Sequence, residues 1–263
     1  MKNNIKRLLY LVIDTINYFS WEKKFGSFRG VYDNFKDASK TIMEKNIGYD
    51  NSETVERYLK SFDKNNNKIS EIEYPLFFWL ANIVYNTTYR KLKVFDFGGN
   101  LGGHYFKFIK ATSLNDLFWT VCEVNAIAET GSKHFANLHL NFVSSIDLSN
   151  GYDVFISSGA IQYVENFSLS LSLSRLVKKP KHILLARLPM QTTRDNFVTI
   201  QNMGTSFSPQ YVFNKNLFIQ NMEYIGYELI DEWSSLFDKC IIPLNRNISV
   251  DAYTGLYFKL KDV

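Results

Sequence analysis

The sequence predicts an α/β fold: a mostly parallel sheet flanked by helices, with a helical N-terminal extension. From about residue 91, short apolar runs alternate with stretches of helical periodicity, the pattern of strands joined by crossover helices. One of these runs leads directly into a glycine-rich loop at 98–103. The first 90 residues lack this alternation. We therefore divide the chain into a helical region, 1–90, and an α/β domain, 91–263.

Composition and charge narrow the class of protein. A chain of 263 residues, 46% of them hydrophobic, can bury one large core. The formal net charge of +4 is mild and no long Lys/Arg block is present, so we expect no nucleic-acid partner. The two cysteines, Cys122 and Cys240, lie far apart and indicate no disulfide framework, which favours a reducing, cytoplasmic compartment.

The four histidines have no metal-ligand spacing, and the sequence predicts no metal site of the His/Cys type. Carboxylates and water remain able to hold Mg²⁺, so whether a metal assists is left open.

The N-terminus carries apolar residues at helical spacing. It is too short and too polar to span a bilayer, and no cleavage site of a signal peptide follows it. We expect a helix that docks on the core or on a second subunit, which leaves a homodimer open. The alternative is a basic amphipathic helix on a membrane surface. Further helices are expected from Asp33, over 51–62 and over 74–86, and this region is expected to shape an acceptor pocket or a dimer contact.

Each element of the α/β domain follows from its local pattern. The long segment from Pro189 to about Gln210 is expected to be irregular, which is typical of functional or mobile loops. A helix is expected at 213–225. The other elements are expected as strands at 93–97, 118–124, 140–143, 153–157, 182–188, 227–233, 240–244 and 254–260, and as helices at 103–112, 126–137 and 167–177.

The ends of the first four strands carry the candidate binding residues, because ligands of open α/β sheets lie beyond the carboxyl ends of the strands. A glycine loop lets a ligand approach the backbone, and the following helix points N–H groups at it. Asp96, just before the loop, would repel a pyrophosphate but suits a cation such as S-adenosylmethionine. Glu123 can accept hydrogen bonds from ribose hydroxyls. The candidate cofactor-binding residues are Asp96, Gly98, Gly99, Asn100, Gly102, Glu123, Ser144, Ser145, Ser158 and Gly159.

Over about residues 90–263 these motifs resemble the class I S-adenosylmethionine-dependent methyltransferases. More narrowly, the chain is similar to a bacterial methyltransferase family associated with surface-polysaccharide (capsule or O-antigen) biosynthesis. That similarity lies in 28–32, 96–102, 158–164, 187–189 and the segment at Gln201.

The resemblance implies a Rossmann-like, seven-stranded, mostly parallel sheet and S-adenosylmethionine as cofactor. It assigns cofactor binding to Asp96, Gly98, Gly102 and Glu123. Asn100 departs from the Gly-x-Gly-x-Gly pattern of the superfamily. Asparagine tolerates left-handed backbone angles, so the loop path is expected to survive this change.

Methyl transfer from a sulfonium requires alignment of acceptor, methyl and sulfur, and an oxygen acceptor also needs a base. The catalytic candidates are His104, Tyr163, Gln162 and Arg187. The helix N-terminus is expected to lower the pKa of His104 and favour its neutral form; a capping role is the alternative. Tyr163 and Gln162 face the expected methyl position or simply pack. Arg187 holds an anionic acceptor or pairs with an acid such as Glu165.

The function expected from these residues is O-methylation of a sugar, or of a phosphorylated or nucleotide-linked precursor, in bacterial surface-polysaccharide biosynthesis. A catalytically inactive binding or scaffold protein is one alternative. An NAD(P)-dependent oxidoreductase is another, for which Gly98, Asn100 and Gly103 would fill the Gly-x-Gly-x-x-Gly pattern. Asn100 breaks that pattern and Asp96 would add a charge beside the phosphates, so this alternative is disfavoured.

Overall fold

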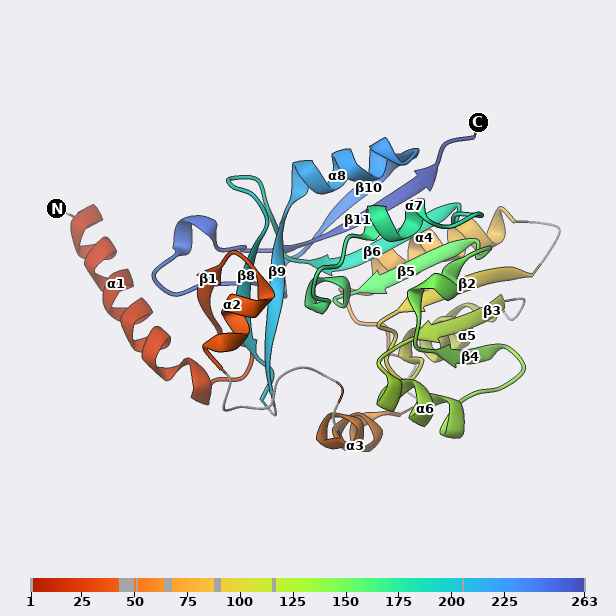
Figure 1. Ribbon diagram of the computed structural model, residues 1–263, viewed down its shortest axis with the longest axis horizontal. Helices are drawn as coiled ribbons and strands as arrows, with labels where there is room; N and C mark the ends of the chain where they lie inside the picture. Colours follow the sequence, from red (N-terminus) through yellow and green to blue (C-terminus); the bar gives the residue numbers. More distant parts are fainter. Residues whose placement is uncertain are drawn as a thin grey trace.

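The computed structural model describes residues 2–42, 50, 52–63, 68–87, 91–114, 117–204 and 206–262, with the side chains of 2–7 left aside. Two sheets organise these residues (Figure 1). The larger has seven strands in the order β10-β11-β6-β5-β2-β3-β4, and the smaller has four in the order β1-β8-β9-β7.

The seven-stranded sheet confirms the predicted fold class. Five neighbouring strands pair in parallel, in the order β6, β5, β2, β3 and β4. Strand β11 runs antiparallel to both β6 and β10. The strands are β2 (Leu92–Phe97), β3 (Leu117–Cys122), β4 (Leu140–Val143), β5 (Val154–Ser158), β6 (His182–Leu188), β10 (Tyr227–Ser235) and β11 (Tyr253–Leu260).

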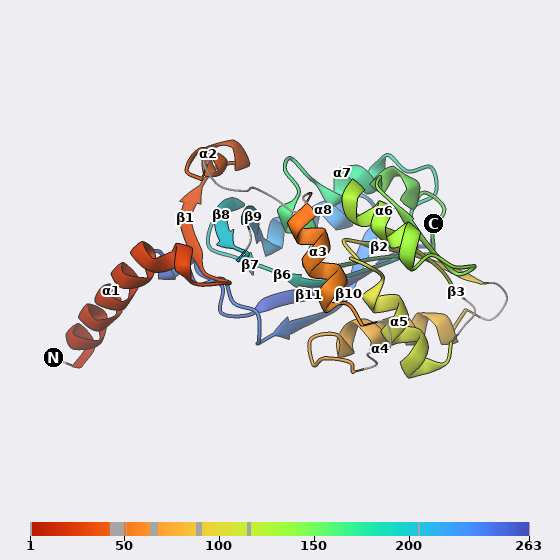
Figure 2. The same cartoon turned by 90° about the horizontal axis from the view of Figure 1, so that it is seen from below.

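Helices cover both faces of this sheet because successive strand residues point to opposite sides. In β2, Val94 packs with side chains of α4 (Tyr74–Tyr85) and α5 (Gly103–Thr112). Its neighbour Phe95 packs with side chains of α7 (Leu169–Ser174) and α8 (Lys215–Tyr224). Figure 2 shows the first pair of helices on one side of the sheet and the second pair on the other. The predicted helix at 126–137 is α6 (Asn125–His134).

The four-stranded sheet is the main departure from the sequence prediction. It joins β1 (Phe28–Tyr32) to the strands β7 (Met190–Gln191), β8 (Phe197–Asn202) and β9 (Phe207–Asn214). The first 90 residues are therefore not helical throughout, and the segment after Pro189 is not irregular. Neither expectation was correct. Strand β8 is buried on both faces, including the polar Thr199, so it lacks the alternation that marks a half-buried strand. Strand β1 is stabilised by its pairing with β8, which is far away in the sequence. The expected strand at 240–244 is only an isolated bridge between Cys240 and Val250.

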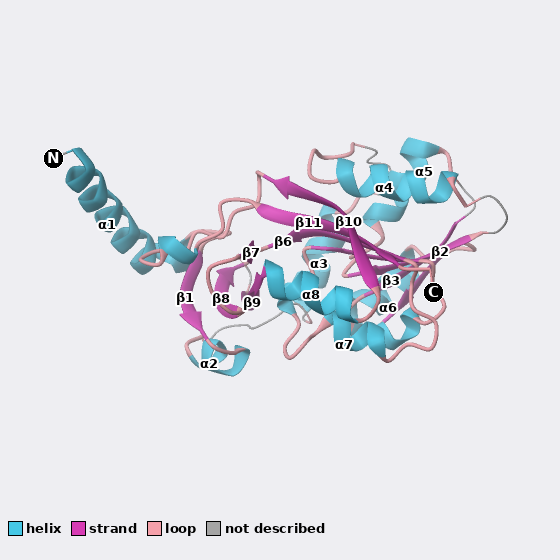
Figure 3. Cartoon of the chain, turned by 90° about the horizontal axis from the view of Figure 1, so that it is seen from above, coloured by secondary structure: helices cyan, strands magenta, loops and turns pink. Residues whose placement is uncertain are grey.

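The remaining helical elements are α1 (Lys2–Ser20), α2 (Phe35–Lys40), α3 (Ser52–Ser61) and the short turns η1 (Trp21–Lys23), η2 (Ile146–Ser149), η3 (Ile161–Tyr163) and η4 (Arg246–Ile248). Helix α1 projects from one end of the molecule, away from both sheets (Figures 1 and 3). Its leucines and isoleucines from Leu8 to Ile16 are exposed, so the expectation that its apolar residues dock on the core was wrong. Among the described helices, none combines the length and the hydropathy needed to cross a bilayer.

Candidate cofactor-binding and active site

A cavity of about 960 Å³ lies at the carboxyl ends of the parallel strands. The glycine loop and the ends of β3, β4 and β5 form one wall, and Ser208 and Pro209 of β9 contribute from the smaller sheet. The cavity therefore lies where the topology of an open α/β sheet predicts a ligand.

The glycine loop adopts the conformation that the sequence predicted. The backbone is left-handed at Gly98 (φ 74°), Asn100 (φ 55°) and Gly102 (φ 85°). Gly99, Asn100 and Gly103 line the cavity at the start of α5. Asn100 thus takes the left-handed turn expected of it, and its side-chain oxygen Oδ1 is buried without a hydrogen-bond partner among the described residues. Gly102 does not line the cavity; it is the N-cap residue of α5 and lies behind Gly103.

Replacement of Gly98 by alanine is expected to displace this loop. The φ of 74° is unfavourable for a side chain, and the added Cβ would overlap the Cβ of Ala160, the residue before η3. We expect a loss of stability of about 1–3 kcal/mol in denaturant unfolding, together with weaker ligand binding. Gly151→Ala is the matched control, because its φ is 79° but nothing lies within 4 Å of its added Cβ. Equal losses in the two variants would show that only backbone strain matters.

Asp96 lies behind the loop and not in the cavity wall. Its side chain is 0% exposed, and its carboxylate contacts His104 Nδ1 at 3.1 Å and accepts a hydrogen bond from Trp119 Nε1 at 3.2 Å. The backbone of Gly99 passes so close that an added Cβ would lie 2.5 Å from Asp96 Oδ2. Asp96 was expected among the cofactor-binding residues, but it does not line the cavity: it lies beneath Gly99 and beside the His104 ring.

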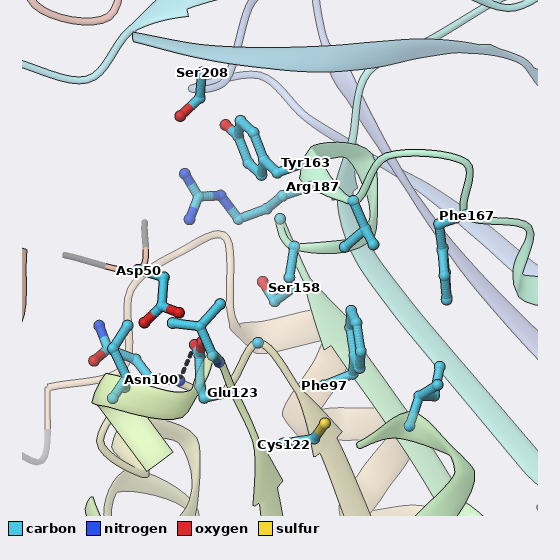
Figure 4. Close-up of a pocket in the computed structure, with 18 of the residues that line it drawn as sticks. Asp50, Phe97, Asn100, Cys122, Glu123, Ser158, Tyr163, Phe167, Arg187 and Ser208 are labelled. Atoms are coloured by element: carbon cyan, nitrogen blue, oxygen red, sulfur yellow. Dashed lines mark hydrogen bonds between the residues drawn. The ribbon is translucent and has the colours of Figure 1, made fainter. Parts of the chain in front are cut away.

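Glu123 points into the cavity from the end of β3 (Figure 4). Its Oε1 accepts a hydrogen bond from the backbone N–H of Asn100 at 3.0 Å. This bond links the end of β3 to the glycine loop that follows β2. Burial, together with the nearby charge of Asp96, raises the pKa of Glu123 to about 7. The backbone hydrogen bonds from Asn100 and Val124 lower the pKa, but they do not offset the effect of burial. A carboxylate desolvated in this way gains most from ligand groups that donate hydrogen bonds or carry positive charge.

The other predicted cofactor residues reach the same cavity. Ser144 and Ser145 lie after β4, and Ser158 and Gly159 lie at the end of β5; all four line the cavity. Ser145 Oγ is engaged locally, because it accepts the N–H of Asp147 at 3.3 Å.

His104 lines the cavity at the first turn of α5. Burial lowers the pKa of this imidazole, but the charge and hydrogen bond of Asp96, together with Glu73, outweigh burial and raise the pKa above its ordinary value. The predicted depression by the helix N-terminus was wrong, because the sequence pattern gave no sign that Asp96 faces this ring. One turn further, Lys107 pairs with Glu73 at 2.7 Å, and both line the cavity.

Arg187 and Tyr163 line the cavity near the smaller sheet, whereas Gln162 does not. Arg187 binds Asp238 through two hydrogen bonds of 2.9 Å, so its acidic partner is not Glu165. The backbone of Arg187 is left-handed, with φ 59°. Tyr163 donates to Gln201 Oε1 of β8 at 2.6 Å. Gln162 is buried behind Arg187 and donates to its carbonyl oxygen at 3.3 Å, which makes it a supporting residue.

Sequence reasoning missed Asp50, Glu73, Lys107 and Ser208 as residues of the cavity wall. No spacing links Glu73 to Lys107, and Ser208 lies in a strand that the sequence pattern did not reveal. Ser208 Oγ is buried without a hydrogen-bond partner among the described residues. Figure 4 shows Arg187, Tyr163 and Ser208 at one end of the cavity and Glu123, Asn100 and Asp50 at the other.

The charges of the cavity wall favour a cationic over an anionic ligand. Each of its cationic groups already faces an acid: Lys107 faces Glu73, Arg187 faces Asp238 and His104 faces Asp96. The further acids Asp50, Glu123 and Glu165 also line the wall. Within the described ranges, no group of three or more His, Cys, Asp and Glu side chains is placed to share a metal ion.

Solved structures of methyltransferases resemble this chain. A protein of Galdieria sulphuraria, assigned as a sarcosine dimethylglycine methyltransferase, superposes with a TM-score of 0.50 at 11% identity over 77% of this chain and 95% of its own. The 1,6-didemethyltoxoflavin-N1-methyltransferase of Burkholderia thailandensis gives 0.49 at 12% identity, over 80% and 87% of the two chains. A protein of Listeria monocytogenes, assigned as an S-adenosylmethionine-dependent methyltransferase, gives 0.48 at 10% identity, over 72% and 100%.

No protein-family model and no curated protein matches the chain. The strand order and the similarity to the Galdieria protein nevertheless agree on the architecture. The chain therefore has the Rossmann-like fold of the class I methyltransferases.

Proposed function

We propose that the protein is an S-adenosylmethionine-dependent methyltransferase. The observation that carries this proposal is Glu123, a half-buried carboxylate that faces the cavity from the end of β3 and meets the glycine loop through the N–H of Asn100. The acid-rich cavity wall supports a ligand with an ammonium and a sulfonium group. The same wall disfavours the pyrophosphate of a nicotinamide cofactor, because anions would meet Glu123 and Asp50 without an unpaired cation in the described part of the wall.

The residues present fit such a cofactor. Glu123 would accept hydrogen bonds from the ribose hydroxyls, and the unpartnered Oδ1 of Asn100 offers a further acceptor. Ser144 and Ser145 would border the adenine, and the backbone of Gly99 and Gly103 would border the amino-acid end. When bound, S-adenosylmethionine supplies an electrophilic methyl group.

The opposite end of the cavity would take the acceptor. Ser208 Oγ and the Tyr163 hydroxyl provide hydrogen-bonding groups for a hydroxylated molecule, and Asp238 fixes the guanidinium of Arg187. His104 can take a proton from the acceptor once it is neutral, because Asp96 holds Nδ1 and fixes the ring. We propose a hydroxyl acceptor, a sugar or a phosphorylated or nucleotide-linked sugar precursor. The surface-polysaccharide context rests on the sequence resemblance alone.

Isothermal titration separates the proposal from the oxidoreductase alternative. We expect micromolar binding of S-adenosylmethionine and no heat with NADH or NADPH; the reverse result would refute a methyltransferase. A tritiated-methyl assay on cell extracts then separates an enzyme from an inactive scaffold, because only an enzyme transfers label to an acceptor.

The affinity for S-adenosylmethionine is expected to rise with pH. With a pKa of about 7, Glu123 is mostly protonated at pH 6 and mostly ionised at pH 7.5, and only the ionised form attracts the cation and accepts both ribose hydroxyls. The dissociation constant should fall about eightfold between these two values, in step with the ionised fraction of Glu123.

Titration calorimetry at both pH values measures this change. Glu123→Gln should remove most of it and leave the smaller contribution of His104, whose deprotonation acts in the same direction. A pH dependence that is the same in both proteins would show that Glu123 does not contact the ligand.

A further inference from the structure

Helix α1 is attached to the rest of the molecule by one polar side. Asp14, in its middle, is 4% exposed and pairs with Arg246 through hydrogen bonds of 2.6–3.0 Å. The Arg246 guanidinium also lies over the ring of Tyr10 at 4.8 Å, and that of Arg29 lies over the ring of Tyr18 at 4.7 Å. These contacts fix one side of α1 toward the body, and the helix stands at the end of the molecule in all three views (Figures 1–3).

The side opposite Asp14 is apolar and exposed. At 100° per residue, six of the large apolar residues of α1 fall within a continuous arc that faces away from Asp14 and holds no charged residue between Leu8 and Phe19. Their exposed fractions lie between 39% and 80%. The residues of this apolar arc are Leu8, Leu9, Val12, Ile13, Ile16 and Phe19. A surface helix normally buries this arc against its own core, so the reversed orientation indicates an external partner.

The segment that carries the apolar arc has a positive net charge. Residues 1–24 carry five basic and two acidic side chains, a net charge of +3 out of the +4 of the whole chain. One of the two acids, Asp14, is neutralised by Arg246. Such a segment complements a surface that is both apolar and negatively charged.

We propose that α1 binds the chain to a membrane surface that contains anionic lipids. The apolar arc lies in the boundary between head groups and acyl chains, and the positive net charge of the segment favours anionic lipids. A second copy of the chain is the less favourable partner, because it would bring two segments of charge +3 together without an unpaired acid in α1 to offset them. The proposal is independent of the methyltransferase function.

Flotation with lipid vesicles tests the proposal. The full chain is mixed with vesicles of 30% phosphatidylglycerol and 70% phosphatidylcholine, or of phosphatidylcholine alone. We expect flotation with the anionic vesicles, weaker flotation when salt is raised from 0.1 to 0.5 M because screening shortens the range of charge attraction, and little with the neutral ones. Ile16→Glu places a charge in the apolar arc and should lower vesicle affinity at least tenfold.

Val177→Glu is the matched control, because it makes the same change in charge at an exposed apolar residue that follows α7. This variant should float as the natural chain does, and both variants should keep the thermal unfolding temperature and the S-adenosylmethionine affinity of the natural chain. Failure of the natural chain to float with anionic vesicles, or equal flotation of Ile16→Glu, would overturn the proposal. A dimer in light scattering that Ile16→Glu dissociates, without vesicle binding, would assign α1 to a second copy instead.

Discussion

Replacement of Glu123 by glutamine is expected to weaken S-adenosylmethionine binding about 100-fold while leaving the fold intact. In the described part of the cavity wall, Glu123 is the only acid at the end of β3, and it contacts the glycine loop. Each hydrogen bond from a ribose hydroxyl to a charged acceptor contributes about 1.5–3 kcal/mol. Loss of about 3 kcal/mol corresponds to about a 100-fold increase in the dissociation constant. Glutamine keeps the size of the side chain and an oxygen that can accept the N–H of Asn100.

Titration calorimetry at pH 7.5 measures the effect, and circular dichroism confirms the fold. Glu129→Gln is the matched control, since Glu129 lies on α6 outside this cavity. A change of less than fivefold in Glu123→Gln, similar to that of the control, would place the ribose elsewhere.

Replacement of Asp96 by alanine is expected to destabilise the protein by about 3–5 kcal/mol, the usual cost of removing one partner of a buried ion pair. The substitution leaves the buried Trp119 Nε1 and the His104 ring without their acceptor and removes the support beneath Gly99. It should also lower the pKa of His104, because the charge that raises it is gone.

Urea unfolding measures the stability loss, and an NMR titration follows the His104 ring. Asp96→Asn keeps an acceptor for Trp119 and should lose less than half as much. A stable Asp96→Ala protein that fails to bind S-adenosylmethionine would restore direct ligand contact, which was the expectation from sequence.

The sequence predicted the α/β domain well because its strands and helices alternate in a way that period and turn residues reveal. The expected helix 103–112 and the strands 140–143 and 182–188 match α5, β4 and β6 to the residue. Periodicity failed for β7, β8 and β9, where burial of both faces and polar residues such as Thr199 and Gln210 hide the strand pattern. It also missed β1, which is stabilised by pairing with β8, about 170 residues later in the chain.

Residue identity predicted the strand ends that face the cavity, but not which way each side chain points. Glu123, Asn100 and Ser158 line the wall, whereas Asp96 and Gln162 lie one layer behind it. Their direction depends on partners such as Trp119 and the carbonyl of Arg187, which are distant in sequence. The sequence pattern did not reveal the pairing of Arg187 with Asp238 either, because this acid is also distant in sequence and lies in the loop after β10.

A crystal structure of the chain with S-adenosylhomocysteine tests the central claim most directly. The claim predicts that the nucleoside lies in the 960 Å³ cavity, with both ribose hydroxyls within hydrogen-bond distance of the Glu123 carboxylate and the amino-acid end above Gly99. A cavity that stays empty at millimolar ligand, or a nucleoside bound with Glu123 turned away from its ribose, would contradict it.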